Sequence, residues 1–65
     1  MNILVIGSGG REHAIIRKLK ESPKTEKLWC APGNGGIAAD AECVAINAMD
    51  IDGVVDFAKK NAVDL

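Results

Sequence analysis

Apolar and polar positions divide the first part of the chain into a strand, a turn and a helix. Residues 2–6 consist of Asn2 and a continuous run of β-branched residues and leucine, which is typical of a strand buried on both faces in a parallel sheet. A glycine-rich turn follows directly. The next segment has the i, i+3, i+4, i+7 spacing of an amphipathic helix, carried by Glu12, Ile15, Ile16 and Leu19. Ser22-Pro23 is expected to end this helix. Because the strand at residues 2–6 is predicted to be buried on both faces, its sheet needs helices on both sides.

The middle of the chain predicts two further strands. Residues 27–31 form the first of these, and the turn-rich residues 32–36 close it. A short alanine-rich connection at residues 37–41 leads to a third, shorter strand at residues 42–46. We expect the strand at residues 27–31 to lie beside the first strand.

A second helix is predicted after the third strand. Its apolar positions recur at helical spacing: Ile51, Val54, Val55, Ala58 and Ala62. Acidic residues begin this segment and lysines end it, which is the polarity that the helix macrodipole favours. Asn61 is expected to take the left-handed conformation that closes many helices.

The last residues, 63–65, resemble the approach to another buried strand. In a doubly wound sheet this strand would pair beside the first one, so without it residues 2–6 form an open edge. The prediction is an α/β fold: a partial Rossmann-like parallel sheet, with residues 1–65 as one incomplete domain of a larger protein. We also expect the isolated chain to be weakly folded or to self-associate through that edge.

Composition excludes several classes of protein. The chain is 48% apolar and 26% charged, with a formal net charge of -1, one Trp, one Phe and no Tyr, so it has neither the basic stripe nor the aromatics of a nucleic-acid binder. Its opening apolar run is too short for a signal sequence or a membrane span, which predicts a cytoplasmic protein without a membrane partner. Cys30 and Cys43 lack the spacing of a zinc or redox motif, so two reduced, packed thiols and no metal site are expected.

The glycine turn after the first strand suits a phosphate. A strand that enters Gly7-x-Gly9 and leaves as a helix directs backbone N–H groups and the positive end of the helix dipole beyond the sheet. Arg11 adds a planar fork of donors, and His13 adds a further possible donor. Two alternatives remain open: the glycines form a purely structural turn, and His13 is a hydrogen-bonded structural residue.

Two features argue against a dinucleotide. The third glycine of a Gly-x-Gly-x-x-Gly motif would fall at Glu12, and the acidic residue that binds a ribose is missing after residues 27–31. The turn also lacks the Gly-Lys-Ser/Thr ending of a P-loop. We interpret Glu12 as a structural residue that accepts hydrogen bonds from amides of a neighbouring loop.

The second glycine turn, residues 32–36, has a simple alternative, because Asn-Gly is the commonest signal of a two-residue β-hairpin. Residues 37–41 have poor strand character and would make a weak hairpin partner. If both strands are parallel, the two glycine turns emerge at the same carboxyl edge of the sheet, where ligands bind in such folds. The sequence therefore predicts one crevice lined by two glycine loops.

These residues carry a resemblance to a known family. The run from Gly7 to Ala14, the pattern Pro32-Gly33-Asn34-x-Gly36 and the pair Asp50-Ile51 resemble, in register, the opening of the phosphoribosylamine–glycine ligases, also called glycinamide ribonucleotide synthetases. The likeness spans the entire chain. It implies the N-terminal Rossmann-like domain of an ATP-grasp enzyme of purine biosynthesis.

The resemblance also implies the reaction of the parent enzyme. Such a ligase uses ATP with Mg²⁺ or Mn²⁺ to activate glycine as an acyl phosphate, which the amine of 5-phosphoribosylamine attacks to give glycinamide ribonucleotide. ATP and the metal are held by later domains that this chain lacks, so it depends on the rest of its own chain. No nucleophile with an adjacent base is present, so no catalytic residue is assigned and the 65-residue chain alone is expected to be inactive.

Carried over residue by residue, the resemblance places one substrate-binding set at the crevice: Gly9, Gly10, Arg11, His13, Gly33, Asn34 and Gly36. Gly7 and Glu12 are assigned structural roles. Backbone amides of Gly9 and Gly10 are expected to face the phosphate or ribose of phosphoribosylamine. The alternatives are a noncatalytic nucleotide- or phosphate-binding Rossmann-like module and the amino domain of another ATP-grasp enzyme, such as a purine carboxylase or formyltransferase. The run Arg11-Glu12-His13 argues against the amino domain of another ATP-grasp enzyme.

Overall fold

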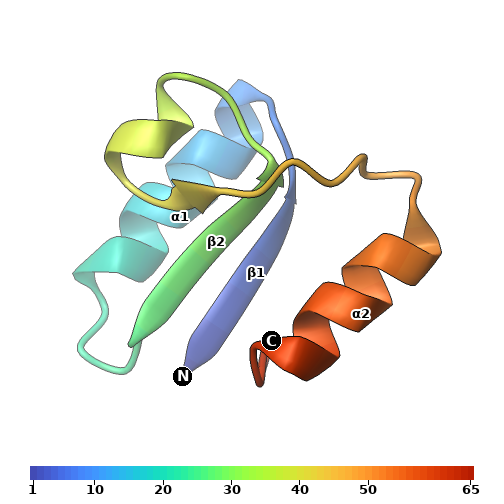
Figure 1. The fold of residues 1–65 in the computed structure, drawn as a ribbon. Coiled ribbons are helices and arrows are strands. Elements are labelled where there is room, and N and C mark those ends of the chain that lie inside the picture. Colours follow the sequence, from blue (N-terminus) through green and yellow to red (C-terminus); the bar gives the residue numbers. More distant parts are fainter.

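The computed structural model describes residues 1–65 and contains a three-stranded parallel sheet (Figure 1). Its order along the chain is β1 (Asn2–Gly7), α1 (Gly10–Glu21), β2 (Lys27–Pro32), the 3₁₀-helix η1 (Ile37–Ala39), β3 (Glu42–Cys43) and α2 (Ile51–Lys60). Strand order in the sheet is β1-β2-β3, and both pairings are parallel. The predicted α/β fold with a Rossmann-like beginning is confirmed, and the hairpin alternative is excluded.

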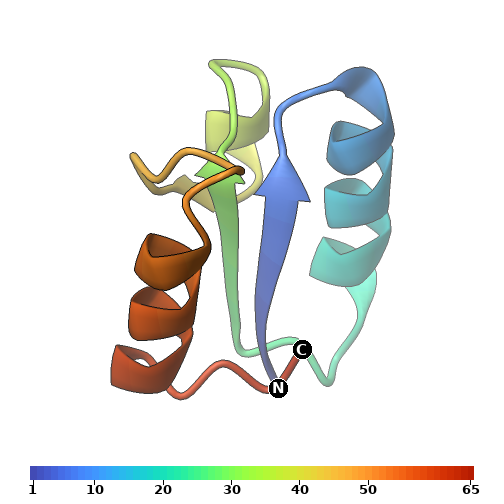
Figure 2. The ribbon, with the colours of Figure 1, turned by 90° about the vertical axis from the view of Figure 1, so that its right-hand side faces the viewer.

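The two long helices cover opposite faces of the sheet (Figure 2). Register pairs Val5 with Cys30, so both side chains lie on one face, and Cys30 is in turn paired with Cys43 of β3. This face carries the core, where Ile16 of α1 and Ile37 of η1 are fully buried against Cys30. The core therefore joins α1, β2 and η1 at the end of the sheet where the predicted crevice lies.

Helix α1 presents a narrower apolar face than its sequence pattern predicts. Ile16 is 0% exposed, whereas Ile15 is 52% exposed. Successive helical residues point about 100° apart, so a helix that touches the sheet along one stripe cannot bury both neighbours. The stripe that packs runs through Ile16 and the partly buried Leu19.

Helix α2 packs loosely on the other face. The carboxylate of Asp50 caps it by accepting a hydrogen bond from the Gly53 N–H at 3.0 Å. None of its residues is fully buried, and it contacts β2 through an edge-to-face pair between Phe57 and Trp29, with ring centroids 5.3 Å apart. Neither long helix has the length and apolar character needed to cross a membrane.

The third strand is shorter than predicted, ending at Cys43 and not at residue 46. The Val44 N–H still donates to the Cys30 carbonyl at 2.8 Å, but the Ile46 N–H turns back to the carbonyl of Val44. Apolar character alone made residues 44–46 look like a strand. In the fold this segment leaves the sheet to reach α2 on the opposite face.

The end of α2 also differs from the prediction. Asn61 has φ -107° and uses its side-chain amide to donate to the Phe57 carbonyl at 3.0 Å, and Ala62 takes the left-handed conformation with φ 51°. Asparagine thus caps through its side chain, and the backbone reversal falls one residue later.

Residues at the end of the chain lie along the outer edge of β1. Leu65 donates its N–H to the Asn2 carbonyl at 3.3 Å and accepts from the Leu4 N–H at 2.9 Å. This alternation is the hydrogen-bond pattern of a parallel ladder. The predicted approach to another strand beside β1 is confirmed, so the open edge of β1 is limited to the residues beyond Leu4.

Candidate functional site

Two glycine loops lie side by side at the carboxyl ends of β1 and β2 (Figure 2). The first comprises residues 7–10 and the second residues 32–36. The Gly33 N–H donates to the Gly7 carbonyl at 3.0 Å, and the side-chain amide of Asn34 donates to the Ser8 carbonyl. The predicted meeting of the two loops at one edge is therefore present, and hydrogen bonds join them directly.

Asn34 forms several hydrogen bonds within the protein. While its Nδ2 bonds Ser8, its Oδ1 accepts from the Ile37 N–H at 2.9 Å, and its backbone carbonyl accepts from the Ala38 N–H at 3.0 Å. The side chain caps η1 and ties it to the first loop. The substrate-binding role predicted for this side chain stays a prediction; in the structure the side chain holds the two loops together.

The first loop is shaped around Glu12. The carboxylate of Glu12 accepts from the Gly9 N–H at 3.0 Å. Gly7 has φ +143°, and a Cβ there would collide with the Glu12 side chain, so this position requires glycine. Glu12 thus has a structural role, although it bonds its own loop and not a neighbouring one. The Gly9 N–H, predicted to face the ligand, already has an acceptor.

Three backbone donors remain open at the start of α1. The N–H groups of Gly10, Arg11 and Glu12 lie in the first turn, where no acceptor exists within the helix, and none bonds elsewhere in the chain. The Arg11 side chain is exposed and forms no ion pair. This combination of free amides, a helix N-terminus and a free guanidinium can receive an anion.

Two thiols form hydrogen bonds to backbone carbonyls of the loops. The Cys30 Sγ lies 3.1 Å from the Gly7 carbonyl oxygen, and the Cys43 Sγ lies 3.5 Å from that of Asn34. Both cysteines are free. Burial, the neighbouring Cys43 and Glu12 raise the pKa of the Cys30 thiol, which keeps it protonated as a donor. Each thiol therefore bonds one of the two loops.

His13 binds a carboxylate that the sequence did not indicate. Its Nε2 lies 2.8 Å from Oδ2 of Asp40, just beyond η1. Oδ1 of Asp40 accepts from Lys20 Nζ at 3.1 Å, and Arg17 Nε lies 3.6 Å from Oδ2. One carboxylate thus joins three side chains of α1 to the segment that follows the second loop.

This cluster predicts a pH effect on folding. Hydrogen bonds from His13 and Lys20 lower the pKa of the Asp40 carboxyl from 3.8 to about 2. Because the folded chain binds this proton more weakly than the unfolded chain, the free energy of unfolding should fall as the pH drops from about 4 through 2. We expect a ¹³C NMR titration of the Asp40 carboxyl to show a midpoint of about 2. In Lys20→Met this midpoint should rise. A midpoint near 3.8 in the wild type would show that Asp40 does not form these hydrogen bonds.

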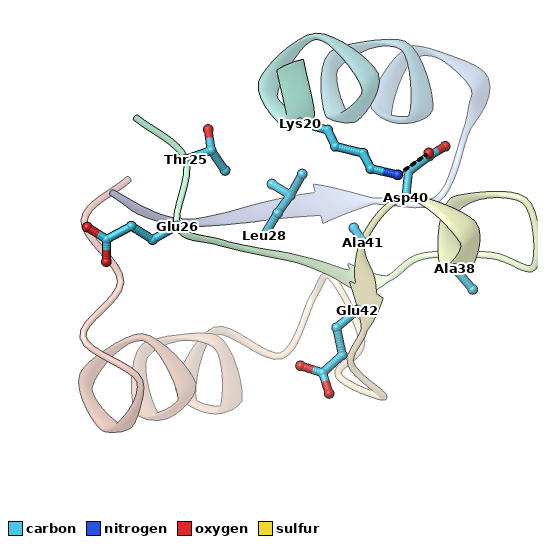
Figure 3. Close-up of a pocket in the computed structure, with 8 residues that line it drawn as sticks. All are labelled: Lys20, Thr25, Glu26, Leu28, Ala38, Asp40, Ala41 and Glu42. Carbon is cyan, nitrogen blue, oxygen red and sulfur yellow. Dashed lines mark hydrogen bonds and ion pairs between the residues drawn. The ribbon is translucent and has the colours of Figure 1, made fainter. Parts of the chain in front are cut away.

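The only hollow in the structure lies elsewhere (Figure 3). It measures about 430 Å³, and none of its lining residues belongs to either glycine loop. Lys20, Leu28 and Asp40 border it, between the end of α1, β2 and the start of β3. The loops carry the free donors, whereas the lysine that borders the hollow is paired with Asp40. No three His, Cys, Asp or Glu side chains gather to hold a metal ion.

The structure brings most of the predicted residues together. Gly9, Gly10 and Arg11 lie in the first loop and at the start of α1. The second loop, which is bonded to the first, carries the other predicted glycines and Asn34. His13 reaches the second loop, since a Cβ on Gly36 would lie 3.5 Å from its Cε1. Sequence reasoning missed Asp40, which lies 27 residues from His13 in an alanine-rich segment that carries no motif.

Comparisons with known proteins find relatives that match the chain along its length. The family model described as "Phosphoribosylglycinamide synthetase, N domain" matches residues 1–65. The chain is 51% identical over 65 residues to the phosphoribosylamine–glycine ligase of Caldanaerobacter subterraneus subsp. tengcongensis. It is 59% identical over 61 residues to that of Listeria innocua and 54% identical over 65 residues to that of Halalkalibacterium halodurans.

These matches cover the chain almost completely and the relatives only in part. The alignments include 100%, 92% and 100% of this chain, but 16%, 14% and 15% of the respective relatives. The chain thus spans about a sixth of the length of the ligases it matches.

Proposed function

Since the chain belongs to the phosphoribosylglycinamide synthetase N-domain family, we propose that it is the N-terminal segment of a ligase that joins 5-phosphoribosylamine to glycine with ATP. The observation that carries this proposal is the match of residues 1–65 to ligases of that name at 51% and 54% identity. In this reaction glycine is activated as an acyl phosphate, and the amine of phosphoribosylamine attacks it. ATP-grasp architecture is part of the proposal.

Within that ligase, the segment contributes to the crevice for the phosphoribosyl group. The free N–H groups at the start of α1 and the unpaired Arg11 supply donors for an anion, and the phosphate is the anionic group of this substrate. Ties between the two glycine loops hold these donors in place. The proposal leaves ATP and its divalent metal to the rest of the ligase.

Arg11→Ala tests this assignment in the intact ligase. A lost hydrogen bond to a charged group costs about 1.5–3 kcal/mol, so the KM for phosphoribosylamine should rise roughly 10- to 150-fold. The KM values for glycine and ATP should stay unchanged. Arg11→Lys should recover part of the loss, because it restores the charge and not the planar fork.

Lys18→Ala is the matched control, because Lys18 is also an exposed cation of α1 without an ion pair. It should behave as the wild type. An unchanged KM for phosphoribosylamine in Arg11→Ala would remove Arg11 from the crevice. A wild-type protein that binds AMP without any glycine-dependent ATP turnover would instead indicate a noncatalytic binding module.

A further inference from the structure

We propose that Asp40 is a positioning residue that fixes the tautomer of His13, and that His13 thereby offers Nδ1 as a hydrogen-bond acceptor to a hydroxyl or amine of the phosphoribosyl substrate. This inference rests on the proposed function and deepens it. It separates the part of the crevice that holds the phosphate from the part that holds the sugar or its amine.

The first step concerns the proton on the ring. His13 Nε2 lies 2.8 Å from Oδ2 of Asp40, and an ionised carboxylate only accepts hydrogen bonds. Asp40 is ionised at neutral pH, because the pKa of its carboxyl is 3.8 without partners and hydrogen bonds from His13 and Lys20 lower it to about 2. Nε2 must therefore carry the hydrogen, and in a neutral imidazole the other nitrogen, Nδ1, keeps its lone pair.

The second step concerns where Nδ1 lies. Nε2 is the ring nitrogen with a hydrogen-bond partner, and Nδ1 has none. A Cβ placed on Gly36 would lie 3.5 Å from Cε1 and 3.6 Å from Nδ1, so this edge of the ring faces the second loop at a residue without a side chain. The His13 side chain is 27% exposed, which leaves the ring accessible to a small molecule.

The third step identifies the kind of group that fits. A lone pair attracts a donor such as a hydroxyl or an amine, whereas phosphate oxygens are themselves acceptors. A phosphate therefore suits Arg11 and the free N–H groups of α1, and Nδ1 suits a ribose hydroxyl or the amine. The sequence marked His13 as a possible donor, and in this proposal its bond to Asp40 leaves Nδ1 as an acceptor.

Two substitutions of His13 separate this role from a structural one. The amide nitrogen of His13→Gln reaches the position of Nε2 and keeps the bond to Asp40, but nothing replaces Nδ1. The amide of His13→Asn reaches the position of Nδ1 and loses Asp40. In the intact ligase, His13→Gln should raise the KM for phosphoribosylamine about 2- to 12-fold at constant kcat, the effect of one neutral hydrogen bond. His13→Asn should recover part of this loss.

Asp40→Asn tests the positioning step, because its side-chain amide can donate to Nε2 and so move the ring hydrogen to Nδ1. The ¹⁵N NMR spectrum of His13 should show an unprotonated Nδ1 in the wild type and a protonated Nδ1 in Asp40→Asn, with the same rise in KM. Lys20→Met is the control, since it removes a partner of Asp40 and leaves the carboxylate on His13. Neither the tautomer nor the KM should change in this control.

The outcomes separate the two proposals. An active wild-type ligase with an unchanged KM in His13→Gln would overturn the role of Nδ1 and leave the proposed function intact. A protonated Nδ1 in the wild type would overturn the role of Asp40. A wild-type protein without glycine-dependent ATP turnover would contradict the proposed function, and the tautomer measurement would still decide whether Asp40 orients the ring.

Discussion

Replacing Gly33 by alanine is expected to lower the free energy of unfolding by about 2–4 kcal/mol, the sum of backbone strain and a packing collision. Gly33 has φ +73°, a conformation that alanine adopts only at a cost. Its new Cβ would lie 2.5 Å from the Sγ of Cys43 and 3.5 Å from the Cβ of Cys30. Strand pairing holds both cysteines in place, so neither can move aside freely.

Gly35→Ala is the matched control for this substitution. A Cβ on Gly35 would meet nothing within 4 Å, and its backbone is not in the left-handed region. The control should lie within about 0.5 kcal/mol of the wild type. Urea unfolding followed by the fluorescence of Trp29, the single tryptophan, measures both variants. If the unfolding curves of Gly33→Ala and Gly35→Ala coincide, the predicted strain and collision at position 33 are wrong.

A second variant on the Gly33→Ala background divides the loss into its parts. Cys43→Ala removes the Sγ that the new methyl group meets, so it should recover part of the collision. The cost of the positive φ remains, because it belongs to the backbone. The free energy of unfolding of a 65-residue chain is roughly 3–10 kcal/mol in total. A Gly33→Ala chain that is already unfolded without urea would therefore agree with the prediction.

Ile37→Ala is the second substitution with a large expected effect, a loss of about 2–5 kcal/mol. Ile37 is 0% exposed and packs against Ile16 and Cys30 in the centre of the core. Its N–H is also the group that the Asn34 side chain caps, so a cavity here lies next to the second glycine loop. The free energy of unfolding in urea measures the effect.

Ile51→Ala deletes the same atoms from an exposed site. Ile51 is 74% exposed at the start of α2, so its loss should change the free energy of unfolding by no more than about 0.5 kcal/mol. If Ile37→Ala and Ile51→Ala lower the free energy of unfolding equally, the core does not extend to η1.

Most of the fold followed from apolar spacing. The strand at residues 2–6 and the two helices have continuous patterns, and local periodicity is enough to predict such elements. Residues 44–46 have the same apolar character and leave the sheet, because the chain must cross to the other face before α2 begins. That requirement comes from the topology and leaves no mark on the residues themselves.

The candidate site was predictable in its backbone and not in its side chains. Glycines at the ends of two parallel strands were sufficient to place two loops at one edge. The partners of Asn34 and His13 lie 26 and 27 residues away in sequence, at Ser8 and Asp40. Ser8 contributes only its backbone carbonyl, a group that every residue has, and Asp40 is a single aspartate outside any motif. Contacts of this kind become visible only when the chain is folded.

The bonds between the two glycine loops have a thermodynamic consequence for whatever binds there. Ordering one residue of a flexible loop costs about 1–2 kcal/mol of conformational entropy. Here hydrogen bonds of Gly33 and Asn34 hold the second loop against the first. This cost is met when the chain folds, so an arriving molecule does not have to order either loop. Its affinity then reflects the contacts it makes, which is the advantage of a preorganised receptor.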